Sequence, residues 1–397
     1  MKWEKVSLLD ISEGGIMVDG DWIESKDQDP KGGIRLLQLA DIGDGFFINK
    51  SKRYINKETA FRLRCTFIEE GDILIARMPD PIGRACIFPL KDDKNFITAV
   101  DVCILRVGKK ANNRYVTHAI NSSGFRNSIN SLITGTTRQR ITRKKLQELT
   151  IPLPPLHIQE QISDTLDKAD ALCRKDQELL TKYDKLAQAI FYDMFGDPEK
   201  NEKKWLQKPI SFGVKAQGGY AFKSSDIVKE GIRLVKISNV SFEKIIWNEL
   251  DYLPTNFYSK HSEFSLNEGD IVIALTRPII KSLDTVKIAR LRNNDIPSML
   301  NQRVARFKID KQKINPFFLL HFCYSIYFKN KIDSYCSTSL QPNISTNQIE
   351  NILMYYPPLS LQHQFEQRIT LVYESKRGVT SEYSLSLMNT LMNNNFS

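Results

Sequence analysis

The sequence lacks the patterns that mark a metal centre or a nucleotide-binding enzyme. Its six cysteines form no Cys-x-x-Cys pair and no short cluster with the five histidines, so no zinc site of the usual spacing is predicted. It has no Gly-Lys-Ser/Thr phosphate loop, no glycine-rich dinucleotide loop and no Asn/Asp-Pro-Pro-aromatic motif of an amino-methyltransferase. We therefore expect reduced, mostly buried thiols, no catalytic residue, no metal site and no cofactor in this chain.

Long apolar runs are also missing. No run of about 18 apolar residues, the length needed to cross a bilayer, is present, and the N-terminal sequence "MKWEKVSLLD" lacks the basic-then-apolar layout of a signal peptide. These absences predict a cytoplasmic protein with no membrane partner.

Composition indicates a globular chain with a basic surface. The 397 residues, 41% hydrophobic and 26% charged, are enough for two or three domains. Lys and Arg number 56 against 46 Asp and Glu, which gives a net charge of +10. A polyanion such as nucleic acid would suit this charge, although a solvated basic surface is the alternative.

The chain contains two copies of one unit, each about half its length. Four pairs of segments recur in the same order at an offset between 198 and 203 residues, which indicates duplication. The pairs are Lys2-Trp3 with Lys204-Trp205, "GIRLLQLADI" from Gly33 with "GIRLVKISNV" from Gly231, "EEGDILIAR" from Glu69 with "NEGDIVIAL" from Asn267, and "ITRKKLQELTIPLPPL" from Ile141 with "ISTNQIENILMYYPPL" from Ile344.

The first part of each copy has a β pattern. Short apolar runs such as "DILIAR" alternate with Gly, Asp, Asn and Pro clusters, which predicts a mainly β domain. The sequences Glu70-Gly71-Asp72 and Glu268-Gly269-Asp270 are typical of tight turns into a strand. The segment "NPFFLLHFCYSIYFKNKI" from Asn315 predicts one buried helix.

After each Pro-Pro-Leu the pattern changes to that of a long helix. From Ile162 apolar residues alternate at spacings of four and three, the seam of a coiled coil. The second copy is weakened by Lys376 and Gly378. About 33 residues would make roughly 50 Å of helix, which favours two helices packed as an antiparallel pair; packing of each helix on its own β domain is the alternative. Predicted helix-pair contacts are Ile162, Leu166, Leu180, Tyr183, Ile190, Phe365, Ile369 and Tyr383.

Glutamines stand in the first turn of each predicted helix. Gln159 and Gln161 are matched by Gln362 and Gln364. They belong either to a solvated helix face or to a contact with the other helix or a partner protein.

These patterns predict an α+β fold with an internal pseudo-twofold repeat. Two mainly β domains with some helices, residues 1–155 and 199–358, alternate with two helical regions, residues 156–198 and 359–397. The two long helices would form an antiparallel coiled coil.

The helical joints resemble the specificity (S) subunits of bacterial type I restriction-modification enzymes. The resemblance is carried by "IPLPPLHIQEQI", the long helix after it and the sequence "FYDMFGDPEKNEKKW" that closes it, and it covers essentially the whole chain. The segment "GGYAFKSSDIVKEGIRLVKISNV" from Gly218 is also similar to the start of a target recognition domain in that family, whereas the first copy departs from it from Glu13 onward.

The resemblance implies a non-catalytic, DNA-binding specificity subunit of a restriction system. Each target recognition domain would bind one half of a bipartite duplex DNA site through the major groove, while the helical pair docks two methyltransferase (M) subunits. Restriction/translocase (R) subunits would complete the complex. DNA adenine methylation and endonuclease activity, used in defence against foreign DNA, would belong to these partners, together with S-adenosylmethionine and ATP with magnesium.

The candidate DNA contacts are basic or polar residues of the two β domains. "TGTTRQRITRKK", from Thr134 to Lys145, has five basic and no acidic residues in a Thr-rich, flexible loop, which suits phosphates. Its counterpart "TSLQPNISTNQI" is uncharged, so its amides are candidate base contacts. The first-domain candidates are Lys26, Arg35, Arg77, Arg84, Arg138, Arg140, Arg143 and Lys144; the second-domain candidates are Tyr220, Lys223, Arg277, Lys281, Lys287, Arg303, Gln341 and Asn343.

Two other classes of function are open at this point. A duplicated scaffold could bind proteins, in which case the basic loops would be incidental. Pro79-Asp80 followed by Asp92-x-Lys94 matches the loose spacing of metal-dependent nucleases, but Pro81 and Pro89 interrupt the strand that such a site needs, so the match is better explained by chance.

Overall fold

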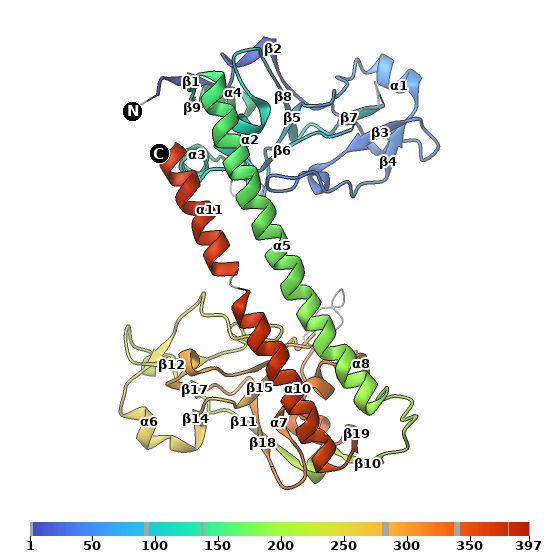
Figure 1. Ribbon diagram of the computed structural model, residues 1–397, viewed down its shortest axis with the longest axis vertical. Coiled ribbons are helices and arrows are strands. Elements are labelled where there is room, and N and C mark those ends of the chain that lie inside the picture. The colour runs from blue at the N-terminus through green and yellow to red at the C-terminus, as the bar shows by residue number, and fades with distance from the viewer. Residues whose placement is uncertain are drawn as a thin grey trace. The chain divides into compact units, whose positions relative to one another are not determined.

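The computed structural model describes residues 3–90, 95–135, 139–279, 286–336, 342–379 and 381–396. The chain forms two compact units (Figure 1). Unit 1 comprises Met1–Gln177 and Thr380–Ser397, and unit 2 comprises Glu178–Val379. The long helix α5 (Leu156–Phe195) contributes its first part to unit 1 and its last part to unit 2. Each unit holds one copy of the β pattern.

Unit 1 is built from two sheets, a short strand pair and four short helices. The strand orders are β2-β8-β5-β6, β4-β3-β7 and β1-β9. The strands are β1 (Lys5–Ser7), β2 (Ser12–Asp19), β3 (Ile34–Leu37), β4 (Arg53–Ile55), β5 (Ile73–Ala76), β6 (Ala85–Ile87), β7 (Phe96–Thr98), β8 (Val102–Val107) and β9 (Thr150–Pro152). The helices are α1 (Lys57–Arg62), α2 (Asn113–Asn121), α3 (Ser123–Asn130) and α4 (Arg143–Glu148), with α11 (Ser381–Phe396) joining from the end of the chain.

Unit 2 repeats this plan. Its strand orders are β11-β18-β15-β16, β13-β12-β17-β14 and β10-β19. The strands are β10 (Leu206–Pro209), β11 (Val214–Gly218), β12 (Ile232–Val235), β13 (Tyr252–Leu253), β14 (Ser265–Leu266), β15 (Ile271–Ala274), β16 (Ile288–Arg290), β17 (Ser298–Leu300), β18 (Val304–Ile309) and β19 (Leu353–Tyr356). The helices are α6 (Phe257–Lys260), α7 (Pro316–Cys323), α8 (Ile326–Cys336), α9 (Thr346–Glu350) and α10 (Leu359–Gly378).

Strands β5 and β15, each inside a four-stranded sheet, are buried on both faces. In β5, Ile73 and Ile75 join a core shared with the helices, whereas Leu74 joins a second core on the opposite face. Strand β15 divides its residues between two cores in the same way. Burial on both sides explains why "DILIAR" and "DIVIAL" are continuous apolar runs rather than alternating ones.

The Glu-Gly-Asp turns are confirmed, and they carry an ion pair. Gly71 has a φ of +89°, a left-handed conformation that glycine adopts without a Cβ clash. The carboxylate of Asp72 accepts a hydrogen bond from the Glu69 backbone N–H at 2.8 Å and two more from the guanidinium of Arg106, each at 2.8 Å. The turn therefore fixes the start of β5 to strand β8.

One predicted helix is wrong in its length. The sequence from Asn315 forms α7 and α8 rather than a single helix. The hydroxyl of Ser325 donates to the Phe322 carbonyl at 2.6 Å and accepts from the Phe328 N–H at 3.2 Å. Such a serine ends one helix and caps the next, which explains the break.

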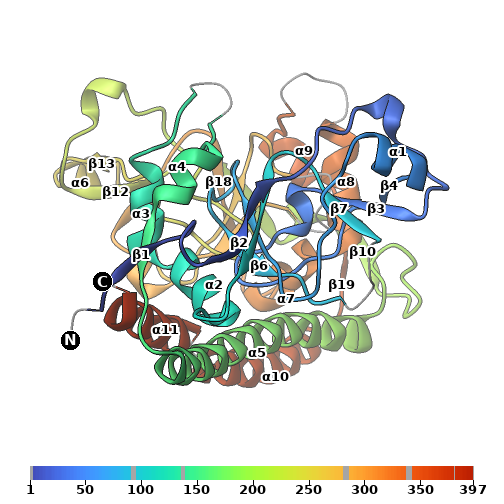
Figure 2. The same cartoon turned by 90° about the horizontal axis from the view of Figure 1, so that it is seen from above.

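The C-terminal helix also differs from the prediction, because it is divided into α10 and α11 on either side of Val379. Within unit 2, α10 runs antiparallel to the last part of α5. The ring of Phe365 lies 5.3 Å from that of Phe195, and further along Lys376 pairs with Asp184. Within unit 1, α11 lies alongside the first part of α5 (Figures 1 and 2), and the two share one core.

Six of the eight predicted seam residues pack in the cores of the two units: Ile162, Leu166, Tyr183, Ile190, Phe365 and Ile369. Leu166, Phe365 and Ile369 are fully buried. Four others are half-buried, and the side chain of Tyr383 lies outside the described residues. The half-buried residues are Ile162, Leu180, Tyr183 and Ile190. The two-domain, helix-paired fold class is therefore confirmed.

Candidate nucleic-acid interface

Gln159 joins the long helix to its own β domain. Its amide is fully buried; the oxygen accepts from the Asn112 N–H at 2.8 Å, and the nitrogen donates to the carbonyls of Lys110 at 3.0 Å and Pro154 at 2.7 Å. The expectation that Gln159 faces solvent, another helix or a partner is wrong, because every hydrogen bond of this amide stays within unit 1.

Gln362 makes the same joint in unit 2. It is fully buried, accepts from the Asn315 N–H at 2.8 Å and donates to the Pro357 carbonyl at 2.8 Å. The stiff Pro-Pro segment is thus tied to the N-terminus of α7, as it is to that of α2 in unit 1. By contrast, Gln161 and Gln364 are exposed, so these two can meet a partner.

Backbone hydrogen bonds gather four loop segments at one end of the large sheet in unit 1. The Asp21 N–H donates to the Thr98 carbonyl at 2.8 Å, the Arg77 N–H to Asp101 at 2.9 Å and the Ile141 N–H to Arg77 at 3.1 Å. We call the described residues around these bonds, 20–22, 98–101, 77–78 and 139–141, the loop edge of unit 1.

Unit 2 has the equivalent bonds at the equivalent positions. The Tyr220 N–H donates to Leu300 at 3.1 Å, the Leu275 N–H to Arg303 at 2.9 Å and the Ile344 N–H to Leu275 at 2.9 Å. Residues 219–221, 300–303, 275–277 and 342–344 therefore form the loop edge of unit 2. The edge is defined by strand ends that lie far apart in sequence, which is why the pattern of single residues did not show it.

The loop edge of unit 2 brings together four of the predicted DNA contacts. Tyr220 is 40% exposed, and Arg277, Arg303 and Asn343 are exposed. The N–H of Arg277 donates to the Pro342 carbonyl at 2.7 Å, which places this arginine next to Asn343.

The other candidates of unit 2 lie beside this group or outside the described residues. Lys223 is exposed just after Tyr220. Lys287 is half-buried, and its N–H donates to the Pro278 carbonyl at 2.6 Å. Lys281 and Gln341 lie outside the described residues, so their placement stays a prediction.

In unit 1 the basic segment is partly helical. Arg140 is exposed at the loop edge, paired in a backbone bridge with Thr134. Arg143 is half-buried and Lys144 exposed, both in helix α4, which Thr142 caps by accepting from the Lys145 N–H. The flexible loop that we predicted is therefore shorter than expected.

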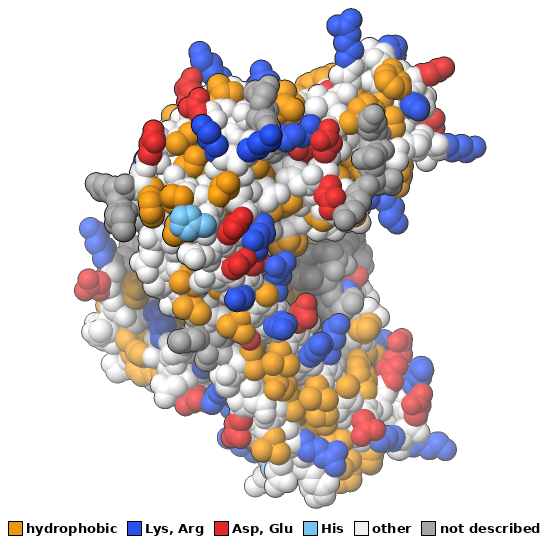
Figure 3. All heavy atoms as spheres, turned by 45° about the horizontal axis from the view of Figure 1, so that its top comes forward, with side chains coloured by type: hydrophobic (Ala, Val, Ile, Leu, Met, Phe, Trp, Pro, Cys, Tyr) orange, Lys and Arg blue, Asp and Glu red, His pale blue; other side chains and the backbone are white. Residues whose placement is uncertain are grey.

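Arg138 and Lys26 are two further candidates in unit 1. Arg138 lies outside the described residues. Lys26 is exposed and pairs with Glu24 at 2.6 Å. Lys and Arg side chains stand out over the visible surface of unit 1 (Figure 3).

Two predicted contacts are corrected because their guanidinium groups serve the fold. Arg77 is only 7% exposed; it lies 3.1 Å from Asp19 and donates to the Val100 carbonyl at 2.5 Å. Arg84 is only 8% exposed and donates to the Ile42 carbonyl at 2.7 Å; burial lowers the pKa of its guanidinium. Neither group is available to DNA.

Arg35 is a third residue held by the fold. Its guanidinium donates to Asn49 and lies 3.5 Å from the buried carboxylate of Asp41. That carboxylate also accepts from the Lys50 N–H at 2.7 Å. Arg35 thus neutralises a buried charge that folds the 38–51 loop, and we do not retain it as a DNA contact.

The two loop edges differ in chemistry. Where unit 2 presents Tyr220, unit 1 has Asp21, whose carboxylate accepts from the Thr66 N–H at 3.0 Å. Burial raises the pKa of Asp21 to about 6. Where unit 2 presents Arg303, unit 1 has Asp101. Two equivalent backbones therefore carry different sets of donors and acceptors.

Trp22 is an exposed residue of this edge that was absent from the predicted contacts. Its side chain is 71% exposed. The only sequence signal was the polar segment "DGDWIESKDQD", in which a lone aromatic residue has no apolar partner at strand or helix spacing.

The described residues contain no group of three or more His, Cys, Asp or Glu side chains placed to hold a metal ion. Pro79 and Asp80 are exposed, whereas Asp92 and Lys94 of the nuclease-like spacing lie outside the description. In the same part of the chain, no helix has both the length and the apolar character needed to cross a membrane.

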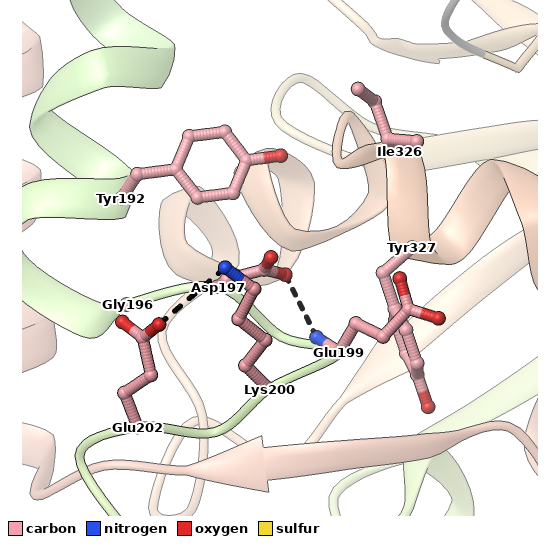
Figure 4. A pocket seen from close by; sticks show the side chains of 8 residues that line it. All are labelled: Tyr192, Gly196, Asp197, Glu199, Lys200, Glu202, Ile326 and Tyr327. Carbon is pink, nitrogen blue, oxygen red and sulfur yellow. Dashed lines mark hydrogen bonds and ion pairs between the residues drawn. The ribbon is translucent and has the colours of Figure 1, made fainter.

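A cavity of about 430 Å³ lies at the end of α5 in unit 2 (Figure 4). Asp197 accepts there from the Glu199 N–H at 2.9 Å, and Lys200 lies 3.6 Å from Glu202. The side chain of Tyr192 faces the same space. These contacts close the loop after the helix and do not form a set of ligands or a nucleophile with a base.

Comparison with known sequences gives two matches to one family. Residues 1–182 and 181–375 each match the family described as "Type I restriction modification DNA specificity domain". The chain is 30% identical over 355 residues to the type I restriction enzyme MjaVIII specificity subunit of Methanocaldococcus jannaschii, covering 86% of this chain and 80% of that protein. It is 37% identical over 144 residues to the EcoAI specificity subunit of Escherichia coli, covering 36% of this chain and 24% of that protein.

Solved structures show the same fold at low identity. The S subunit of a type I restriction-modification system from M. genitalium superposes with a TM-score of 0.54 and 16% identity, over 100% of this chain and 96% of that chain. A chain from a structure of type I R-M complex assembly and conformational transition gives a TM-score of 0.52 and 16% identity, over 99% and 97%.

Proposed function

Because the chain belongs to the family of type I restriction-modification DNA specificity subunits, we propose that its two units each recognise one half of a bipartite duplex DNA site. One observation carries this proposal: the loop edge occurs twice, on equivalent backbone hydrogen bonds, with different side chains. A duplicated scaffold supplies the same geometry for two half-sites, and the differing side chains supply two different sequences.

The side chains of unit 2 have the chemistry of base contacts. Arginine can donate two hydrogen bonds to guanine in the major groove, and asparagine can form a matched pair with adenine. Arg277, Arg303 and Asn343 are exposed together with Tyr220 at the edge. We assign these four side chains to the half-site of unit 2.

Unit 1 would use a different set. Arg140 is the exposed base-contact candidate at its edge, and Arg143 and Lys144 on α4 are placed to bind phosphates. Asp101 adds an acceptor that can take a hydrogen bond from the amino group of cytosine. Lys223 would bind phosphate beside the edge of unit 2.

Catalysis would belong to partner subunits. Two methyltransferase subunits would dock on the two helical regions, where Gln161 and Gln364 are exposed at equivalent positions, and restriction subunits would complete the assembly in the cytoplasm. S-adenosylmethionine and ATP with magnesium would bind those partners. This chain would provide the sequence recognition.

The test is to map methylated adenines in DNA from cells that carry the chain with its cognate methyltransferase. We expect a motif with two short defined halves around an unspecified spacer. Arg277→Ala or Asn343→Ala should relax only one half, and Arg140→Ala only the other. A continuous motif, or magnesium-dependent cleavage by the purified chain alone, would contradict the proposal.

A further inference from the structure

Trp22 is much more exposed than a side chain that packs in a hydrophobic core would be. At 71% it has the largest exposed fraction among the large hydrophobic side chains of the described ranges. Tryptophan is seldom left in water, because its ring is the largest apolar side-chain surface. A ring displayed in this way beside a candidate DNA interface indicates a contact that forms on binding.

The backbone on either side of Trp22 is held in place. Gly20 packs so closely on the neighbouring strand that a Cβ there would lie 2.3 Å from the Ala99 carbonyl oxygen. The Asp21 N–H and carboxylate are both hydrogen-bonded, as described above. Ile23 packs on the small core beneath α1. The backbone of this segment is therefore fixed, and the Trp22 side chain extends from it into solvent.

The faces of the indole are the groups left to bind. Its N–H donates to Glu24, and hydrogen bonds from Lys26 and Trp22 lower the pKa of that carboxyl. The only polar atom of the ring is thus used. Contact by stacking on a base or a sugar is the remaining option, and it does not depend on hydrogen-bond pairing.

Helix α1 and the residues around it give this surface a positive charge. Arg62 on α1 pairs with Asp27 at 2.7 Å, and the Thr66 N–H bonds to Asp21, so Arg64 lies beside the Trp22 segment. Lys57 and Arg64 are exposed. Lys50, Lys52 and Arg53 are exposed just before α1.

Within the described part of the chain none of these five basic side chains forms an ion pair. In Figure 3, Lys and Arg side chains project from the region of unit 1 around α1, with hydrophobic groups between them. One hydrophobic side chain of this region, Phe61 on α1, is 63% exposed. Basic groups interleaved with exposed aromatic rings are the surface that nucleic acid binds.

Unit 2 lacks this surface. Strand β4 pairs with β3 as β13 pairs with β12, with Ile55 opposite Ile34 and Leu253 opposite Ile232, so residues 50–64 correspond to 248–262. The first stretch has six Lys or Arg and one Glu, whereas the second has one Lys, one Glu and one Asp. The charge belongs to unit 1 rather than to the shared scaffold.

We propose that Trp22, Lys57 and Arg64 form a second DNA contact in unit 1, in which the Trp22 ring stacks on a base or sugar flanking the half-site and the two basic side chains bind the adjacent phosphates. This inference rests on the proposed function. It extends the DNA-contacting surface of unit 1 from Trp22 at the loop edge to Lys57 and Arg64, and it makes the two units unequal in how much DNA they cover.

The experiment measures binding of a duplex carrying the mapped site by the full chain assembled with its methyltransferase subunits, at several salt concentrations. Trp22→Ala should weaken binding roughly ten-fold, and Trp22→Phe should retain most of the affinity. Lys57→Ala with Arg64→Ala should lower the slope of log K against log salt by about 1.8, since each lost phosphate contact contributes about 0.9.

Matched controls separate a local effect from a general one. Leu206→Ala removes another exposed apolar side chain, 60% exposed on β10. Lys308→Ala with Lys311→Ala removes two exposed charges at the end of β18 opposite Arg303. Both control variants should bind DNA as the wild type does. In addition, quenching of tryptophan fluorescence by DNA should be smaller in Trp22→Phe than in the wild type.

The outcomes distinguish this inference from the proposed function. Wild-type binding and salt slope in both the Trp22→Ala and the Lys57→Ala/Arg64→Ala variants, with weakened binding in Arg140→Ala, would overturn the second contact and leave the bipartite model in place. If methylation mapping yields no bipartite site, the proposed function itself fails.

Discussion

The two units place a histidine at the same point of the fold and surround it differently. In unit 1, His118 of α2 lies 2.7 Å from the carboxylate of Asp167. In unit 2, His321 of α7 is 2% exposed, and its ring lies 2.9 Å from the Tyr373 hydroxyl and 3.3 Å from Gln188. One histidine meets a carboxylate, and the other meets a hydroxyl, an amide and aromatic rings.

The repeat preserves backbone joints more strictly than side-chain chemistry. The buried glutamines, Gln159 and Gln362, share two bonds: each accepts from the N–H of an asparagine that caps a helix and donates to a proline carbonyl of its Pro-Pro segment. Their surroundings differ: in unit 2 Phe365 packs against Phe191 and Phe195, whereas its counterpart in unit 1 is the aliphatic Ile162, in a core with Met392 and Phe396. The helices of the two units should therefore differ in stability, even though each begins with the same buried glutamine joint.

The largest expected effect comes from truncating equivalent seam residues. Phe365 is fully buried against Phe191 and Phe195, whereas its counterpart Ile162 is only half-buried. Phe365→Ala should cost about 3 to 5 kcal/mol of stability because it opens a cavity. Ile162→Ala should cost less, about 1 to 2 kcal/mol, since part of that side chain is already in water. Hydrogen exchange of α10 and of the first part of α5 measures each loss where it occurs; equal losses would contradict the comparison.

The glutamine joints should respond alike in both units. Gln159→Ala and Gln362→Ala each leave a buried backbone N–H and at least one buried carbonyl without a partner, so we expect a loss of about 2 to 3 kcal/mol in each unit. Gln161→Ala and Gln364→Ala, at exposed neighbouring positions, should change stability by less than about 0.5 kcal/mol. Urea unfolding of the four variants provides the measurement. A large loss for Gln161→Ala would show that exposure does not decide the effect.

The histidines offer a pH test of the difference. Burial lowers the pKa of His321 to about 3, below its unfolded value of about 6.5. The unfolded chain therefore takes up a proton first, so the stabilisation is complete above about pH 6.5 and is lost as the pH falls toward 3. At pH 5 the loss of stability amounts to about 2 kcal/mol. His321→Gln should flatten the fall in stability between pH 7 and 5, whereas His118→Gln should leave that fall in place. An unchanged slope in His321→Gln would contradict burial of a neutral imidazole.

Repetition in the sequence was enough to predict the architecture. Four paired segments and the change of period after each Pro-Pro-Leu indicated two β domains and the helices between them, and the structure and the comparisons confirm that fold. Continuous apolar runs such as "DILIAR" predicted strands because burial on both faces requires them. The helix breaks at Ser325 and Val379 were missed, since a single hydroxyl cap or loop residue interrupts a pattern that otherwise continues.

The candidate interface was less predictable, because it depends on how loops meet. Arginine is the residue type expected at DNA, so Arg77 and Arg84 were predicted as contacts. Their guanidinium groups instead bind carbonyls and a carboxylate that come near only in the folded chain. Trp22 was missed for a different reason. A single aromatic residue in a polar segment forms no hydrophobic repeat, so pattern analysis did not identify it. Tyr220, Arg277, Arg303 and Asn343 were named individually, whereas their grouping follows from backbone bonds between distant strands.

The smallest expected effect concerns why one helix is continuous and the other is divided. Helix α5 has no glycine between Leu156 and Phe195, whereas α10 ends at Gly378. A Cβ at Gly378 would meet no heavy atom within 4 Å, so alanine fits without a clash. Because glycine loses more backbone freedom in a helix than alanine, Gly378→Ala should stabilise α10 by about 0.5 to 1 kcal/mol. Circular dichroism and hydrogen exchange at the end of α10 measure this gain. Destabilisation would mean that the junction needs glycine for its backbone, and the division of the C-terminal helix would then be a required feature of unit 2 rather than a consequence of weak helix propensity.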